Sequence, residues 1–182
     1  EGLSLRAQAS GSRGADLVTP DYVLSNTASS LWTAGVSGRL QRGAVTVSVG
    51  FDHYDLAAGI CFCTAPQNVT EFEAQLTRSA PLGSEGWTSD YEIERPYQRV
   101  RHERVLGRIE VLTTAGVLTS TTSIQRNHRQ EFETARASIE GPQYDFVLRT
   151  TQQELAFEHG AISVARGAKM VGTYGIIGAL QD

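Results

Sequence analysis

The sequence contains very little lysine and cysteine. Lys169 is the single lysine among 16 basic residues, and 20 acidic residues bring the net charge to −4. This balance gives no reason to expect nucleic acid as a partner. Two cysteines are too few for a disulfide-stapled mini-domain. No apolar run approaches the roughly 18 residues of a transmembrane helix, and no signal peptide is visible at the start.

Period-two alternation of apolar and polar residues dominates what is present. Val, Thr, Ile, Tyr and Phe recur in such runs, which favours β-strands over helices. A length of 182 residues suits one domain. We therefore predict an all-β fold, an antiparallel up-and-down meander. Its strands are expected near residues 3–10, 31–40, 44–56, 98–114, 117–130, 144–158 and 162–179.

The connections between these segments alternate in length. Long connections follow the first, third and fifth segments, and tight turns at 41–43, 115–116 and 159–161 follow the others. In a meander this order puts every long loop at one end of the sheet. Transmembrane β-barrels have long extracellular loops and short periplasmic turns. We therefore expect this meander to be part of a transmembrane β-barrel.

The register of the tight hairpins supports one apolar face. A turn at Gln41 and Arg42 would place Trp32 opposite Phe51, with the apolar residues of both strands on one side. Such an aromatic pair suits an interfacial girdle, and it also suits an ordinary soluble sheet. The next hairpin, with Thr113 opposite Leu118, gives one largely apolar and one charged face.

One loop carries a motif of the form T-P-D-x-V-L-x-N-T before a strand. Its residues are Thr19, Pro20, Asp21, Val23, Leu24, Asn26 and Thr27. This stretch resembles the TonB-dependent outer-membrane receptors. The segments IERPYQRVRHERVLGRIEV (93–111) and SIQRNHRQEFE (123–133) resemble the strands that follow in that family. The resemblance runs in order from about residue 18 to residue 179.

The resemblance implies uptake of a scarce nutrient across the bacterial outer membrane. The cargo would be a metal chelate such as a siderophore, cobalamin or a metal ion, and the TonB complex would act through a plug domain. Receptors of this kind have 22 strands around a plugged lumen. Residues 1–182 show about seven strands, no plug and no closing strand, so we expect an internal fragment of the barrel in contact with outer-membrane lipid. No cofactor and no catalytic residue is expected.

Two alternatives to the receptor stay open at this point. The first is a soluble β-sandwich or adhesin-like binding domain, with shorter or broken strands and its apolar face packed inward. The second is a smaller complete outer-membrane barrel, which requires a closing strand.

Six residues are candidate ligand contacts. His53 and Asp55 are expected at the mouth of the barrel, and Asp90 and Glu92 have the spacing of one strand face. The pair in Cys61-Phe62-Cys63 could be a redox pair, soft-metal ligands, unpaired loop residues or a local disulfide. The full set is His53, Asp55, Cys61, Cys63, Asp90 and Glu92.

A basic stripe lies in the fourth predicted strand. Arg99, Arg101, Arg104 and Arg108 are interspersed with Glu103 and Glu110. The stripe could attract an anionic cargo or lipopolysaccharide phosphate. The competing interpretation is a mixed-charge wall of the lumen.

Overall fold

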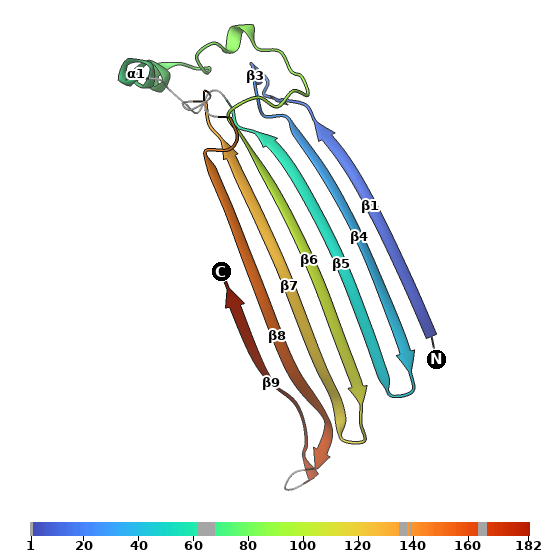
Figure 1. Ribbon diagram of the computed structural model, residues 1–182. Coiled ribbons are helices and arrows are strands. Elements are labelled where there is room, and N and C mark those ends of the chain that lie inside the picture. The colour runs from blue at the N-terminus through green and yellow to red at the C-terminus, as the bar shows by residue number, and fades with distance from the viewer. Residues whose placement is uncertain (1, 62–67, 135–137, 139, 164–166) are drawn as a thin grey trace.

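A single antiparallel sheet makes up most of the molecule (Figure 1). The computed structural model describes residues 2–61, 68–134, 138, 140–163 and 167–182. Seven strands pair in chain order, which confirms the predicted meander. They are β1 (Gly2–Gly14), β4 (Ser29–Arg42), β5 (Val45–Gly59), β6 (Tyr97–Leu112), β7 (Gly116–Phe132), β8 (Tyr144–Ser163) and β9 (Lys169–Gln181).

The long connections gather at one end of the sheet and the tight hairpins at the other (Figure 1). The connection 15–28 contains two short strands, β2 (Leu17–Val18) and β3 (Val23–Leu24), which pair with each other. The connection 60–96 contains α1 (Val69–Thr77) and the 3-10 helix η2 (Ser84–Gly86). We call this end the loop end and the opposite end the hairpin end.

The helix α1 was not expected from the sequence. Asn68 caps it: its side-chain oxygen accepts a hydrogen bond from the Glu71 backbone N–H at 2.9 Å, and its amide donates to the Glu71 carboxylate at 3.1 Å. Asn68 is thus a side-chain N-cap, and a second hydrogen bond joins its side-chain amide to the carboxylate three residues further along. An Asn-x-x-Glu signal before a helix-forming stretch was therefore present in the sequence.

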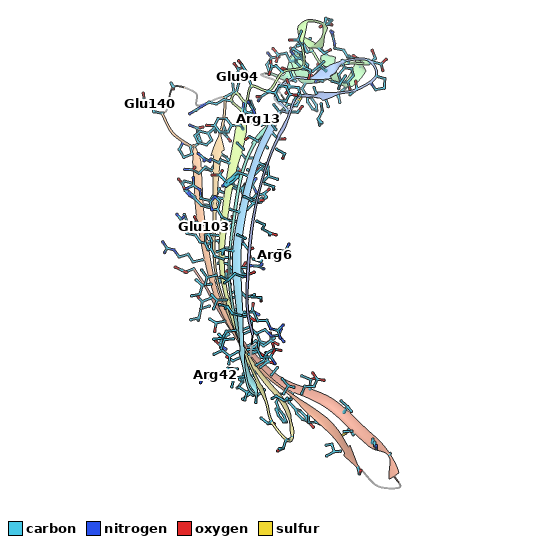
Figure 2. All side chains as sticks on the ribbon, turned by 90° about the vertical axis from the view of Figure 1, so that its right-hand side faces the viewer. Arg6, Arg13, Arg42, Glu94, Glu103 and Glu140 are labelled. Atoms are coloured by element: carbon cyan, nitrogen blue, oxygen red, sulfur yellow. The ribbon has the colours of Figure 1, made fainter. Side chains whose placement is uncertain are left out.

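The register sorts the side chains onto two faces. The band face carries an apolar row that runs across four strands through Val36, Phe51, Val105 and Ile124. The polar face carries the intervening residues, among them Arg6. Figure 2 shows the sheet bowed along its strands, with Glu103 on the outer side of the bow and Arg6 on the inner side. Glu103 belongs to the band face, beyond its apolar rows.

Both predicted hairpin registers paired the wrong residues but placed the side chains on the correct faces. Trp32 pairs with Asp55 rather than Phe51, because the turn closes at Gly43, whose φ of 58° is the left-handed value that a tight hairpin turn needs. In the second hairpin Leu118 pairs with Val111, not with Thr113. Each shift is an even number of residues, and an even shift leaves every side chain on its predicted face.

The predicted turn at residues 159–161 was also wrong. Strand β8 continues through these residues to Ser163. The Gly160 backbone N–H donates to the Ala115 carbonyl at 3.0 Å, so the strand end packs against the neighbouring hairpin. The pairing with β9 shifts between His159 and Ile162, and glycine in a strand often marks such a bulge.

The sheet is a single open layer in the described part of the chain. Its edge strands β1 and β9 do not pair with each other, so no closed barrel is present among these residues. Ala28 and Cys61 are the buried apolar residues, and both lie at the loop end. Within the same described residues, no helix is long and apolar enough to cross a membrane.

Candidate functional site: the clasped loop end

Two buried polar residues tie the connection 15–28 to the connection 60–96. Asp16 and Asn26 are 5% and 3% exposed, respectively. The Asp16 carboxylate accepts hydrogen bonds from the backbone N–H groups of Thr27 at 2.6 Å and Ala28 at 2.8 Å. The Asp16 backbone N–H donates to the Asp90 carbonyl at 2.8 Å. We call this arrangement of Asp16 and Asn26 the loop clasp.

Asn26 satisfies three backbone groups of the second connection. Its side-chain amide donates to the carbonyls of Ile60 at 3.0 Å and Pro96 at 2.8 Å, and its side-chain oxygen accepts from the Glu94 N–H at 2.8 Å. Its φ of 61° lies in the left-handed region, which asparagine tolerates better than most residues. Asparagine therefore suits this position through both its backbone and its side chain.

The threonines of the T-P-D-x-V-L-x-N-T motif shape the first connection. The Thr19 hydroxyl donates to the Tyr22 carbonyl at 2.8 Å and accepts from the Tyr22 N–H at 3.0 Å. The Thr27 hydroxyl donates to the Leu24 carbonyl and accepts from the Leu17 N–H, both at 2.7 Å. With Asn26, these contacts give a local physical role to three polar residues of the motif.

Asp90 and Glu92 lie in this loop end and not on a strand, which corrects the strand-face interpretation of their spacing. The Glu92 backbone N–H donates to the Asp90 carboxylate at 2.8 Å, so the two residues form a turn. With Asp16, Asn26 and Glu94 they line a small cavity of about 90 Å³. Among the described residues, no group of three or more His, Cys, Asp or Glu side chains is placed to hold a metal ion.

His53 and Asp55 lie on the band face of β5, towards the loop end. His53 Nδ1 is 3.6 Å from a Glu103 carboxylate oxygen. The Asp55 carboxylate accepts hydrogen bonds from Arg99 at 3.0 and 2.8 Å and a longer contact from Arg101 at 3.3 Å. Asp55 is therefore engaged in ion pairs between β5 and β6, and His53 lies beside the Glu103 carboxylate of the same strand pair.

These contacts between β5 and β6 form a charged border beyond the last apolar row. Arg126 is 3.5 Å from Glu103, so the border continues from β6 to β7. The hydrogen bonds from Arg99, opposed by desolvation, hold the pKa of the Asp55 carboxyl below its usual range. The basic stripe divides at this border: Arg99 and Arg101 share the band face with Asp55, whereas Arg104 and Arg108 lie on the polar face.

An aromatic groove of about 430 Å³ adjoins the charged border on the band face. Trp32, Tyr97 and Phe132 line it with Ile93 of the second connection and the paired Asp55 and Arg99. The rings of Tyr97 and Phe132 stack with centroids 4.2 Å apart. Large amphipathic rings beside charged groups are suited to a boundary between apolar and aqueous surroundings.

Cys61 is buried at the loop end and is disulfide-bonded. A disulfide-bonded sulfur is not a thiolate, so in this state Cys61 does not offer the ligand that a soft metal requires. Cys63 lies outside the described residues.

Sequence reasoning missed Asp16 as part of this site, although it found Asn26 through the motif. The available signal was an aspartate in a loop, a residue type that often accepts hydrogen bonds from nearby backbone N–H groups. Its contacts reach residues 11 and 12 positions further along the chain, so no short motif contains them.

No protein-family model, no curated protein and no solved structure matches this chain. The structure and its chemistry therefore carry the functional argument. What they establish directly is a seven-stranded antiparallel meander with two chemically different faces and a clasped loop end.

Proposed function

We propose that this chain forms part of the wall of a TonB-dependent outer-membrane receptor for a small, scarce nutrient. The apolar rows of the band face would contact lipid, and the polar face would line the lumen. The connections 15–28 and 60–96 would form part of the vestibule that receives the cargo. A plug domain outside residues 1–182 would couple the receptor to the TonB complex.

The observation that carries this proposal is the sharp boundary of the apolar rows. On β6, Val105 and Ile109 are 45% and 47% exposed. Towards the loop end, the residue that follows Val105 on the same face is Glu103. On β7, Ile124 is followed on that face by Arg126. An apolar band that ends in a charged border on successive strands is typical of a surface that meets lipid and then headgroups.

The apolar rows are long enough to form the central part of a membrane band. From Val45 to Phe51 on β5 they run about 20 Å along the strand, at ~3.3 Å per residue. Outer-membrane barrels carry an apolar band of roughly 25 Å between two aromatic girdles, and Trp32 lies beyond the charged border, level with Asp55. The strand lengths also support the proposal, since the seven strands of the main sheet have 13 to 20 residues. A soluble sandwich generally uses shorter strands and a second layer.

The test compares two adjacent residues on opposite faces of β5. Val49 lies on the band face and Ser48 on the polar face. Each would be replaced by cysteine in the intact gene product, in a background with Cys61 and Cys63 changed to serine, and spin-labelled in membranes. Collision rates with oxygen, which concentrates in lipid, and with a water-soluble nickel chelate would then be measured.

A lipid-facing band predicts that the label at Val49→Cys collides several times more with oxygen than with the chelate. The adjacent label at Ser48→Cys should show the reverse preference. A soluble sandwich predicts low collision rates with both reagents at Val49→Cys, because that side chain would be packed in a core. Equal preference at both sites would also overturn the proposal.

A further inference from the structure

A hollow lies on the polar face, on the side of the sheet opposite the aromatic groove. Two adjoining cavities of about 270 and 260 Å³ share Arg6, Ser37, Gly50 and Leu106. The small residues Ser37 and Gly50 pair across β4 and β5 and form its floor. Longer side chains of β1 and β6 rise on either side, so the hollow arises from the order of small and large residues across four strands.

The charge around this hollow is not balanced. Arg104 pairs with Asp52 at 2.7 Å, and Arg108 pairs with Glu110 at 2.9 Å. The other two arginines have no carboxylate partner in the described part of the chain. Arg6 donates to the neutral amide oxygen of Gln8 at 2.9 Å.

Arg39 makes no ion pair or side-chain hydrogen bond to the described residues, and it lines the larger cavity. The four arginines Arg6, Arg39, Arg104 and Arg108 thus face two carboxylates, which leaves two positive charges uncompensated.

The register brings these arginines around one point. Arg39 and Arg108 flank Ser48 on its two neighbouring strands, and Arg6 is aligned with Gly50 across Ser37. Neighbouring strands are about 4.8 Å apart, a distance that an arginine side chain exceeds. Guanidinium groups from both sides can therefore reach a ligand placed above Ser48 and Gly50, where the serine hydroxyls can also donate hydrogen bonds.

We propose that this hollow binds a small anion that carries phosphate or carboxylate groups. Guanidinium groups bind both kinds of oxyanion through paired, charge-assisted hydrogen bonds. Each cavity is near the lower end of the size range of small-molecule sites, so the occupant is a compact solute. This site depends on the polar face alone and does not require that the band face contacts lipid.

Calorimetric titration of the intact gene product in a non-ionic detergent tests the site, with pyrophosphate and citrate as separate probes. Saturable binding of at least one probe is expected. Arg39→Gln and Arg6→Gln should each weaken it roughly tenfold, the loss expected for one charge-assisted hydrogen bond. Arg149→Gln is the matched control, because it removes the same charge from the band face and should leave affinity within twofold.

The preference between the two probes assigns the anion to the phosphate or the carboxylate class. Absence of saturable binding by both would overturn the proposal, as would equal losses in Arg39→Gln and Arg149→Gln. Binding of a glutamate-rich peptide but of neither small anion would show that the hollow receives a protein segment, which also overturns it. Far-UV circular dichroism confirms that the variants keep the sheet, and spin-label accessibility tests the receptor proposal independently.

Discussion

Replacement of Asn26 by alanine should open the loop clasp without unfolding the sheet. The side chain is 3% exposed and makes three hydrogen bonds to backbone groups of the second connection. Alanine removes all three, so the Ile60 carbonyl and the Glu94 N–H lose this partner, while the Pro96 carbonyl keeps the hydrogen bond from the Ile60 N–H. It must also adopt the positive φ of 61° that asparagine holds here.

The size of the effect follows from these contacts. Each hydrogen bond contributes about 1 kcal/mol net, and a left-handed backbone costs alanine about 1 kcal/mol more, so the clasp should lose roughly 4 kcal/mol. This corresponds to a rise in local opening of about three orders of magnitude. Asn26→Gly removes the same hydrogen bonds without the backbone strain. Its rise in local opening should therefore be roughly fivefold smaller than that of Asn26→Ala.

Native-state hydrogen exchange measures this opening directly. The reporters are the amide of Ile60, which donates to the Pro96 carbonyl at 2.9 Å, and the amide of Gly59, which donates to the Ala28 carbonyl at 2.9 Å. Both should exchange faster in Asn26→Ala, while amides in the middle of β6 keep their protection. Unchanged exchange at Ile60 would refute the clasp, and equal acceleration throughout β6 would refute its local character.

Gly59→Ala should open the same clasp, because an added Cβ would clash with the Asn26 carbonyl oxygen. Gly107→Ala is the control, since there is open space around its Cβ. Equal hydrogen-exchange rates of the Ile60 amide in the two variants would contradict the steric argument. The ion pair of Asp55 with Arg99 should stabilise the sheet above the normal carboxyl pKa of about 3.9, because folding lowers this pKa. Its contribution should be lost as the pH falls through the lowered value, and Asp55→Asn should flatten the acid limb of a stability-against-pH curve.

The sequence predicted the strands and their faces because both depend on local alternation. The seven expected segments correspond in order to the seven strands of the main sheet. Even where the hairpin register was misplaced, Trp32 and Phe51 stayed on one face, since an even shift preserves the alternation. Alternation alone does not fix which residues pair, and the positive φ of Gly43 set the turn instead.

The loop clasp and the polar hollow were harder to predict because their residues meet across long stretches of sequence. Asn26 reaches Pro96, and Arg6 shares a cavity with Arg104. Such contacts depend on strand order and register together. The individual arginines of β6 were noticed as one basic stripe, but only the pairing of strands divides them between two faces and adds Arg6 to one group.

The energetics of a single-layer sheet connect these features to the proposed function. A sheet with one apolar face gains stability when that face is covered, since hydrogen bonds alone contribute little net free energy in water. Val49 and Ile124 are 55% and 52% exposed, and the second connection lies at the loop end rather than over the apolar rows. The described residues therefore supply no layer over these apolar rows. A second protein layer would usually require a continuous apolar surface, whereas Glu103 and Arg126 interrupt this one at a common height on neighbouring strands. In the proposed receptor, lipid bordered by polar headgroups would satisfy both the apolar rows and their charged border, and it would leave the polar face free to bind a solute.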